Sequence, residues 1–197
     1  MISRFIIVLS AILPLVGCIG GIRDTTTART ATEILLVSTA AERAIHNYKV
    51  DPNLKGKKVT IDDSRYDSVD KPYVTSALRE HLSESGAIIV ADGSDFTVEV
   101  RNGTLGIYDR DFTIGIPGLP VALGGIGAEL PPVITPPLSL FRRDTSQGWC
   151  KMQLWIYKTE DNTFVSKSSD LWGSSYYNQW ILLFIGPFDS SNDIYPD

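Results

Sequence analysis

The sequence has few of the side chains that enzymes use for nucleophilic, acid–base or metal chemistry. It contains two cysteines and two histidines among 197 residues. The serine-hydrolase pattern G-x-S-x-G, the phosphate-binding Walker loop and the zinc pattern H-E-x-x-H are all missing. We therefore predict a non-catalytic protein that has no cofactor and no metal site.

A long run of basic residues is also missing. The chain has 18 Lys and Arg residues against 23 acidic residues, and its formal net charge is −5. Nucleic-acid binding depends on clustered cations that neutralise phosphates, and attachment to anionic lipid by a polybasic segment has the same requirement. We expect neither a nucleic-acid partner nor a polybasic membrane anchor.

The beginning of the chain does carry a targeting pattern. Arg4 precedes the apolar stretch Phe5–Val16, which is too short to cross a membrane as a permanent helix but has the length of a signal-peptide core. Residues 15–18 then read Leu-Val-Gly-Cys, which matches the bacterial lipobox. We predict a lipoprotein signal peptide over residues 1–17 and lipidation, with diacylglycerol and palmitate, at Cys18. The alternatives are an ordinary secretory leader with a chance cysteine and a short N-terminal anchor.

Lipidation at Cys18 would leave residues 18–23 as a tether and residues 24–197 as a single α/β domain. In the enteric lipoproteins that this leader resembles, Asp after the cysteine retains the protein at the inner membrane, whereas this chain has Ile19. We therefore expect a protein of the cell envelope, held by its lipid to the outer membrane and facing the periplasm. Cys150 has no partner cysteine left, and we predict that it is a buried free thiol.

The mature chain alternates helical and strand patterns, which predicts an α+β fold with helices and sheet in a two-layer α/β sandwich. Residues 57–62 alternate polar and apolar side chains as a strand does, and Asp70 begins a helix that Gly86 ends. A short apolar strand follows, so this region is predicted to be a βαβ unit that antiparallel strands follow. Its short strand covers residues 87–90, and the other predicted elements are a helix from residues 24–27 to Tyr48, a strand over 96–107 and a hairpin over 152–168. The predicted core contains Val59, Ile61, Val74, Leu78, Leu82, Ile88, Val98 and Val100.

A Gly/Pro-rich apolar insertion over residues 112–141 interrupts this pattern. Glu129 is its only charged residue, and its prolines forbid a transmembrane helix or a central strand. It either folds over the domain's own core or forms a surface that contacts a membrane or another subunit. A second apolar segment, residues 176–185, is interpreted as core, with interfacial contact as the alternative. The candidate interaction residues of the insertion are Ile114, Ile116, Leu119, Val121, Leu123 and Ile126.

An acidic cluster follows the first predicted strand and consists of Asp62, Asp63, Asp67 and Asp70. Such oxygen ligands suit hard cations, but the spacing misses the calcium-loop pattern and lacks its central Gly. A solvated loop, with Asp70 as a helix cap, is the preferred interpretation.

From Gly56 to Val100 the chain reads strand, helix, Gly, short strand, acidic linker and then a strand with alternating valines. This arrangement, together with the lipobox, resembles the curli-secretion-channel, penicillin-binding-protein-activator and plasmid complement-resistance lipoproteins. The later residues fit no family with an assigned function. The resemblance implies a non-enzymatic α/β domain used in envelope assembly or surface interaction, and it carries over no site residues.

Two functions are compatible with these observations. The first is a non-catalytic envelope lipoprotein that contacts a membrane surface, an envelope protein or further copies of itself in a homo-oligomer. The second is a lipid-anchored periplasmic hydrolase that uses Asp62, Asp63 or His81. The lack of a nucleophile–base pattern favours the first.

Overall fold

The computed structural model describes residues 29–116, 120–121, 133–134, 138–183 and 185–195. The predicted signal peptide, Cys18 and the residues proposed to begin the first helix lie outside this part. The described residues from Ala31 onward form one compact unit.

Two helices and a seven-stranded mixed sheet make up this unit, so the predicted α+β class is confirmed. The sheet order is β2-β1-β3-β6-β8-β9, and β7 pairs with β6. Strands β4 and β5 pair separately. The elements in chain order are α2 (Ala31–His46), the 3-10 turn η2 (Pro52–Leu54), β1 (Lys58–Asp62), α3 (Lys71–Glu84), β2 (Ile88–Ile89), β3 (Phe96–Ile116), β4 (Pro120–Val121), β5 (Val133–Ile134), β6 (Leu138–Lys158), β7 (Phe164–Lys167), β8 (Leu171–Leu182) and β9 (Ile185–Asn192).

The predicted βαβ unit is present as β1, α3 and β2, because β1 pairs in parallel with β2. The predicted hairpin is present as β6 and β7 in the same sheet. Gly86 ends α3 in the left-handed region at φ +92°, as a C-terminal glycine does. Asp70 occupies the N-cap position, although its side chain makes no capping hydrogen bond. The first helix begins later than predicted, since Arg29 and Thr30 are not helical.

The extent of the insertion was predicted wrongly. Strands β3 and β6 have 21 residues each and pair from Phe96–Lys158 to Ile116–Leu138, a length of roughly 70 Å. Residues 112–116 and 138–141 therefore continue the sheet rather than interrupt it. The physical reason is that alternation of side chains persists to Ile116, and the first proline follows only at Pro117.

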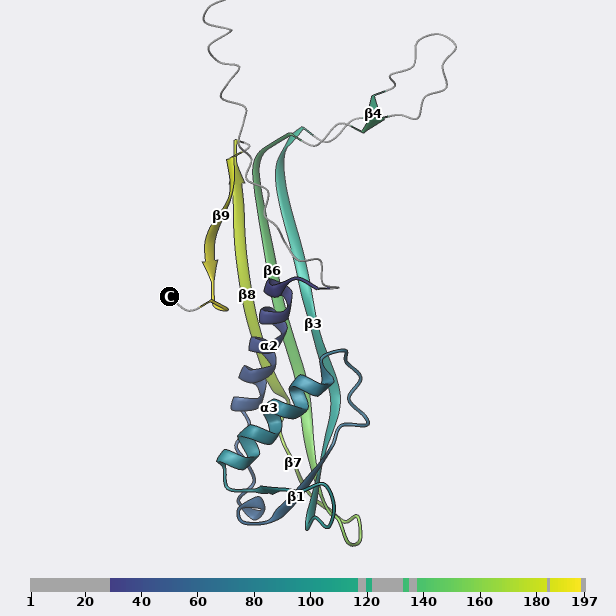
Figure 1. Cartoon of the computed structure of the whole chain (residues 1–197). Coiled ribbons are helices and arrows are strands. Elements are labelled where there is room, and N and C mark those ends of the chain that lie inside the picture. Colours follow the sequence, from purple (N-terminus) through teal and green to yellow (C-terminus); the bar gives the residue numbers. More distant parts are fainter. Residues whose placement is uncertain (1–28, 117–119, 122–132, 135–137, 184, 196–197) are drawn as a thin grey trace, which may run out of the picture. The chain divides into compact units, whose positions relative to one another are not determined.

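Both helices pack on one face of the sheet, over the half that contains β1 and β7 (Figure 1). Most of the predicted core is buried, including Val59, Val98 and Val100, and Ile61 packs against it while partly buried. Ile88 is half exposed, so its prediction was wrong. Strand β2 lies at the sheet edge, and alternation turns Ile89 rather than Ile88 toward the helices.

Helix α2 lies very close to β6 and β8 because glycine faces it from each strand. A Cβ atom on Gly148 would lie 2.3 Å from the carbonyl oxygen of Leu36, and one on Gly173 would lie 1.9 Å from that of Ala40. The Ser175 hydroxyl donates a hydrogen bond to the Leu36 carbonyl at 2.6 Å. Neither described helix is long and apolar enough to cross a membrane.

Candidate functional site

The sheet face opposite the helices has no described helix on it. Strand alternation places Cys150 and Met152 of β6 under the helices, so Trp149, Lys151 and Trp155 point to this open face. Trp172 and Tyr176 of β8 lie beside them by register and are exposed. The open face is therefore rich in aromatic side chains that contact solvent.

Cations stack on these aromatic rings in the half of the open face that backs the helices. The Arg101 guanidinium lies 4.6 Å from the centroid of the Trp155 ring, and the Lys151 ammonium lies 4.8 Å from that of Trp172. Lys151 also pairs with Asp170 at 3.0 Å, and this hydrogen bond is the main reason that the pKa of Asp170 is lowered. Charges in this half of the open face are thus matched within the chain.

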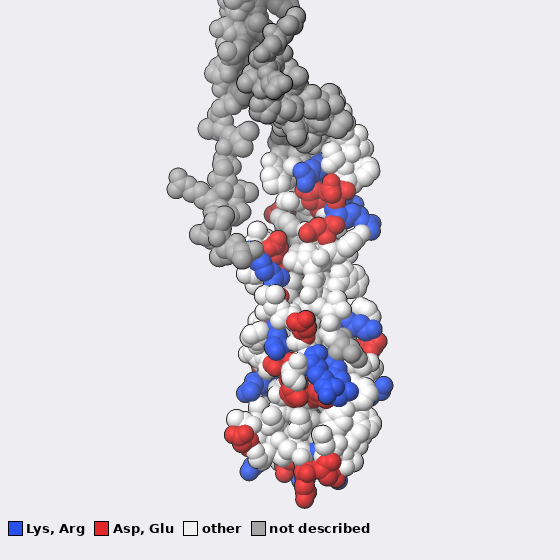
Figure 2. Space-filling view, turned by 90° about the vertical axis from the view of Figure 1, so that its right-hand side faces the viewer, with Lys and Arg blue, Asp and Glu red and all other residues white. Residues whose placement is uncertain are grey.

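The far end of the sheet differs because it carries no charge. Here β3, β6, β8 and β9 end in segments 112–116, 138–141, 180–183 and 185–188, none of which contains a charged residue. We call these segments the uncharged end. In Figure 2 the described surface beside it is white, and mixed blue and red begin below. Its exposed large apolar residues are Phe112, Ile114, Ile116, Leu140, Leu182, Leu183, Ile185 and Phe188.

The interpretation of residues 176–185 as core was therefore wrong for much of the segment. Leu182, Leu183 and Ile185 are 44%, 57% and 65% exposed. The reason is topological, since β8 and β9 form a hairpin that extends past the helices (Figure 1).

A hollow of 630 Å³ lies on the open face where the uncharged end meets the charged part of the sheet. It is lined on β3 by Tyr108, Arg110 and Phe112, and on β6 by Phe141, Arg143, Thr145 and Gln147. We call it the arginine groove. Arg110 pairs in register with Thr145, and Phe112 with Arg143, so the two arginines are diagonal neighbours about 7–8 Å apart at the backbone.

The acidic residues of the same strands face the other way. Asp109 accepts a hydrogen bond from Ser146 at 2.6 Å, and Asp144 pairs with Arg142 at 2.8 Å, all on the helix side of the sheet by alternation. Arg110 makes a cation–π contact and a hydrogen bond with Tyr108, and it has no other polar partner among the described residues. Arg143 has no ion pair or hydrogen bond to another described residue. Sequence reasoning missed the groove, because its two arginines lie on strands 33 residues apart in the sequence.

The predicted interaction residues lie in this region where the structure describes them. Ile114 and Ile116 end β3 and are 53% and 58% exposed. Val121 belongs to β4 and pairs with Val133, and its side chain is not described. Leu119, Leu123 and Ile126, like the lipidation residue Cys18, lie outside the described residues.

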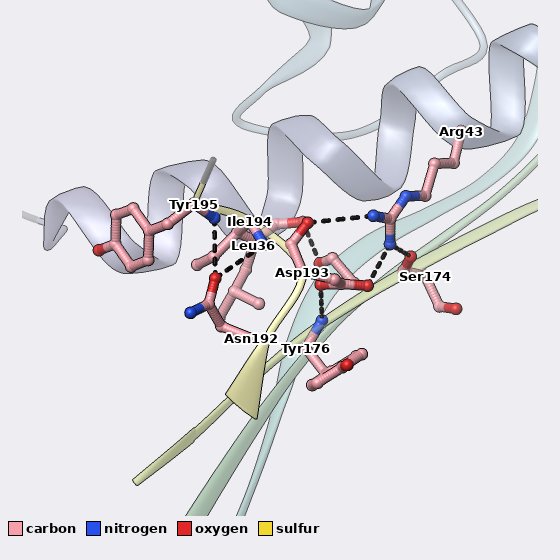
Figure 3. Close-up of polar contacts among 9 residues, drawn as sticks. Leu36, Arg43, Ser174, Tyr176, Asn192, Asp193, Ile194 and Tyr195 are labelled. Atoms are coloured by element: carbon pink, nitrogen blue, oxygen red, sulfur yellow. Dashed lines mark hydrogen bonds and ion pairs between the residues drawn. The ribbon is translucent and has the colours of Figure 1, made fainter. Parts of the chain in front are cut away.

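A second feature that sequence reasoning missed closes the outer edge of β8 (Figure 3). Arg43 of α2 donates to the Ser174 carbonyl at 2.6 Å and pairs with the Asp193 carboxylate, which also accepts from the Tyr176 amide at 2.6 Å. Asn47, the residue that follows α2, donates to the Trp172 carbonyl at 3.0 Å. These side chains thus hydrogen-bond the backbone groups of β8 that β9 does not pair. Their role is to position the C-terminus rather than to carry out chemistry.

The acidic cluster makes local structural bonds. Asp62 accepts from the Ser64 amide at 2.9 Å, which lowers its pKa, and Asp63 accepts from the Thr75 hydroxyl at 2.6 Å. Lys71 lies 3.7 Å from Asp63. Within the described ranges, no group of three or more His, Cys, Asp or Glu side chains is placed to hold a metal ion.

The two histidines, His46 at the end of α2 and His81 of α3, are neighbours with ring centroids 5.6 Å apart. His46 Nδ1 lies 2.8 Å from the Glu42 carbonyl, and His81 Nε2 lies 2.9 Å from that of Tyr48. The hollow that both line has neither Asp62 nor Asp63 in its wall. Cys150 is buried as predicted, and burial raises the pKa of its thiol to about 11, so it is protonated at neutral pH.

Comparison with known proteins adds one match. The profile of a family of unknown function (DUF6655) matches residues 13–196, nearly the whole chain. No curated protein matches the sequence.

Proposed function

We propose that this chain, which belongs to the DUF6655 family, is a lipid-anchored, non-catalytic protein of the bacterial envelope that acts by contact through the uncharged end of its sheet. The outer membrane, on its periplasmic side, is the proposed location. The observation that carries the proposal is the set of exposed apolar side chains on two hairpins at one end of the sheet.

An apolar surface of this extent favours association, because covering it with a partner removes apolar area from water. Removing apolar area from water contributes about 25 cal/mol per Å², so covering one large aliphatic side chain contributes on the order of 1–2 kcal/mol. Six large aliphatic side chains and two phenylalanines are exposed at the uncharged end. Large exposed apolar patches mark contacts with membranes or other proteins. The lipobox supports a membrane close by, since lipid on Cys18 would hold the chain there.

A hydrolase has less support. Asp62 and Asp63 are engaged in a turn and at the first turn of α3, whereas His81 lies near the other end of α3. Six residues of helix separate Thr75 from His81, about 9 Å along the helix axis. A catalytic site that used both acids and the histidine would require all three to reach one substrate. Their positions at opposite ends of α3 disfavour such a site.

The anchor is tested first. In the Cys18→Ala variant, expressed in a bacterial host, the chain should stay unprocessed and lose its acyl groups. Mass spectrometry of the wild-type N-terminus would contradict the proposal if it found an unmodified terminus at any other residue.

The contact is tested by a photoreactive amino acid at Ile116, with the same amino acid at Val69 as the matched control. Val69 is 88% exposed but lies far from the uncharged end, in the loop before α3. Crosslinking in intact cells should give adducts at position 116 and few at position 69. Equal yields at the two positions would show that the uncharged end is not a contact surface.

A further inference from the structure

The arginine groove sits between a charged and an uncharged part of one sheet face, and its side chains change in order along the strands. On the open face, Arg110 pairs with Thr145, the next row toward the end pairs Phe112 with Arg143, and the row after that pairs Ile114 with Phe141. Rows on one face are about 7 Å apart. Polar side chains thus give way to apolar ones within two rows.

Aromatic side chains lie at the level of Arg143. Register places Trp180 beside Arg143, and Phe188 beside Trp180 with ring centroids 4.7 Å apart. Phe112 and Phe141 pack edge to face at 6.5 Å. A layer of aromatic rings and arginines next to an uncharged end is the arrangement that polypeptides adopt at the boundary between lipid headgroups and acyl chains.

The electrostatics of the groove favour an anion. Arg110 and Arg143 are diagonal neighbours, and the nearest acidic residues along their strands, Asp109, Asp111 and Asp144, alternate to the opposite face. Guanidinium groups bind phosphate oxygens through paired hydrogen bonds. A ligand with a phosphate and an attached apolar chain would meet both the arginines and the uncharged end.

We propose that the arginine groove binds the phosphate of an anionic phospholipid, with the uncharged end seated in the outer part of the acyl layer. This inference rests on the proposed contact role and names its partner. Free phosphate would use the arginines but not the apolar rows, and the continuous change from polar to apolar side chains argues for a lipid.

Seating must be shallow, because β3 has an open edge. Strand β1 pairs with β3 only from Phe96 to Glu99, so among the described strands none lies along the outer edge of β3 from Arg101 to Ile116. Unpaired backbone groups are costly in the hydrocarbon core but can bond to water and headgroups at the interface. A depth of about 5–10 Å, as for other interfacial segments, keeps the rows at Arg110 and Arg143 at the phosphates.

The test uses the full-length lipidated protein in phosphatidylcholine vesicles containing a trace of photoactivatable phosphatidylglycerol. Labelled peptides are identified by mass spectrometry. We expect label in residues 108–116 and 141–143. The double substitution R110Q/R143Q should lower it roughly 30-fold, because each cation near an anionic lipid contributes about 1 kcal/mol. R79Q/R142Q is the matched control, since it removes two charges outside the groove and should keep the label. R110K/R143K, which keeps both charges, should retain most of it.

Three outcomes would overturn the inference. If a photoactivatable phosphatidylcholine probe, used in place of the phosphatidylglycerol probe, labelled these residues equally, the groove would not select an anionic headgroup. Loss of label on adding inorganic phosphate would show a site for the free anion. Crosslinks from this region to a second copy or to another protein, without lipid label, would assign the surface to a protein. None of these results decides whether Cys18 is lipidated or whether position 116 forms adducts in cells. Those two experiments test the proposed function separately.

Discussion

The two halves of the sheet are built from the same strands but follow different rules. In the half covered by α2 and α3, the face toward the helices is apolar and buried and carries Val98, Val100, Leu154 and Ile156. Beyond the helices, the same face carries mostly polar side chains. The apolar side chains there lie on the open face and at the uncharged end. The helices cover the apolar face of one half, whereas the apolar side chains of the distal half stay exposed, and the proposed contact role rests on this difference.

The largest expected effect tests the stability role of the covered half. Leu78→Ala removes a fully buried side chain of α3 and should lower the free energy of unfolding by about 2–5 kcal/mol. Ile114→Ala removes an apolar side chain from the uncharged end and should change it by less than about 0.5 kcal/mol. Urea unfolding of both variants measures this. Similar losses would erase the distinction between the two halves.

A smaller effect tests how tightly α2 is packed. Gly173→Ala places a Cβ atom against the Ala40 carbonyl and should cost about 1–3 kcal/mol through overpacking. Gly106→Ala is the control, because a Cβ atom there meets nothing within 4 Å. Thermal unfolding should separate the two variants by several degrees. If Gly173→Ala were as stable as wild type, the close approach of helix and sheet would be in doubt.

The buried thiol predicts a pH dependence for the covered half. The folded chain holds the Cys150 proton to about pH 11, whereas the unfolded chain releases it near pH 9.0. The unfolded state therefore binds fewer protons between these values, and the free energy of unfolding falls as pH rises, by roughly 3 kcal/mol in total. Cys150→Ala should lack this part of the alkaline loss, while tyrosines titrate in both proteins. Parallel stability curves for the two proteins from pH 8 to 11 would contradict the prediction.

The smallest effect concerns the junction between the halves, where Arg43 holds Asp193 and the edge of β8. Arg43 is partly exposed, so Arg43→Ala should cost only about 1 kcal/mol. Amide exchange at Tyr176 should become faster, because its acceptor is the Asp193 carboxylate. Arg79→Ala, on the exposed face of α3, should change neither quantity. Unchanged exchange at Tyr176 in Arg43→Ala would mean that the C-terminus is held by other contacts.

Local pattern was enough to predict the βαβ unit and its core. The spacing of Val74, Leu78 and Leu82, with Gly86 after them, specifies a helix with one buried face wherever it packs. It failed at Ile88, because a two-residue edge strand carries too little alternation to show which side chain faces inward. It failed at residues 112–116 and 138–141 because glycine and apolar content were taken as signs of an irregular loop, although alternation continued.

Candidate surfaces were harder to predict than elements. Ile114 and Ile116 were predicted from their apolar context alone, and both are exposed. Arg110 and Arg143 gave no sequence signal, since each stands in a short charged stretch in which an aspartate neighbours it. Likewise, His46 and His81 become neighbours only because α2 packs on α3.

The sequence by itself determined the helices, the βαβ unit, the burial of Cys150 and the apolar character of the uncharged end. These features depend on residues that lie close together in the sequence. Tertiary structure alone decided which cations meet, which apolar segments stay exposed, and how α2 closes the edge of β8. The physical reason is that sheet register sets pairs across long loops. A shift of one residue between β3 and β6 would turn Arg143 to the other face and abolish the groove.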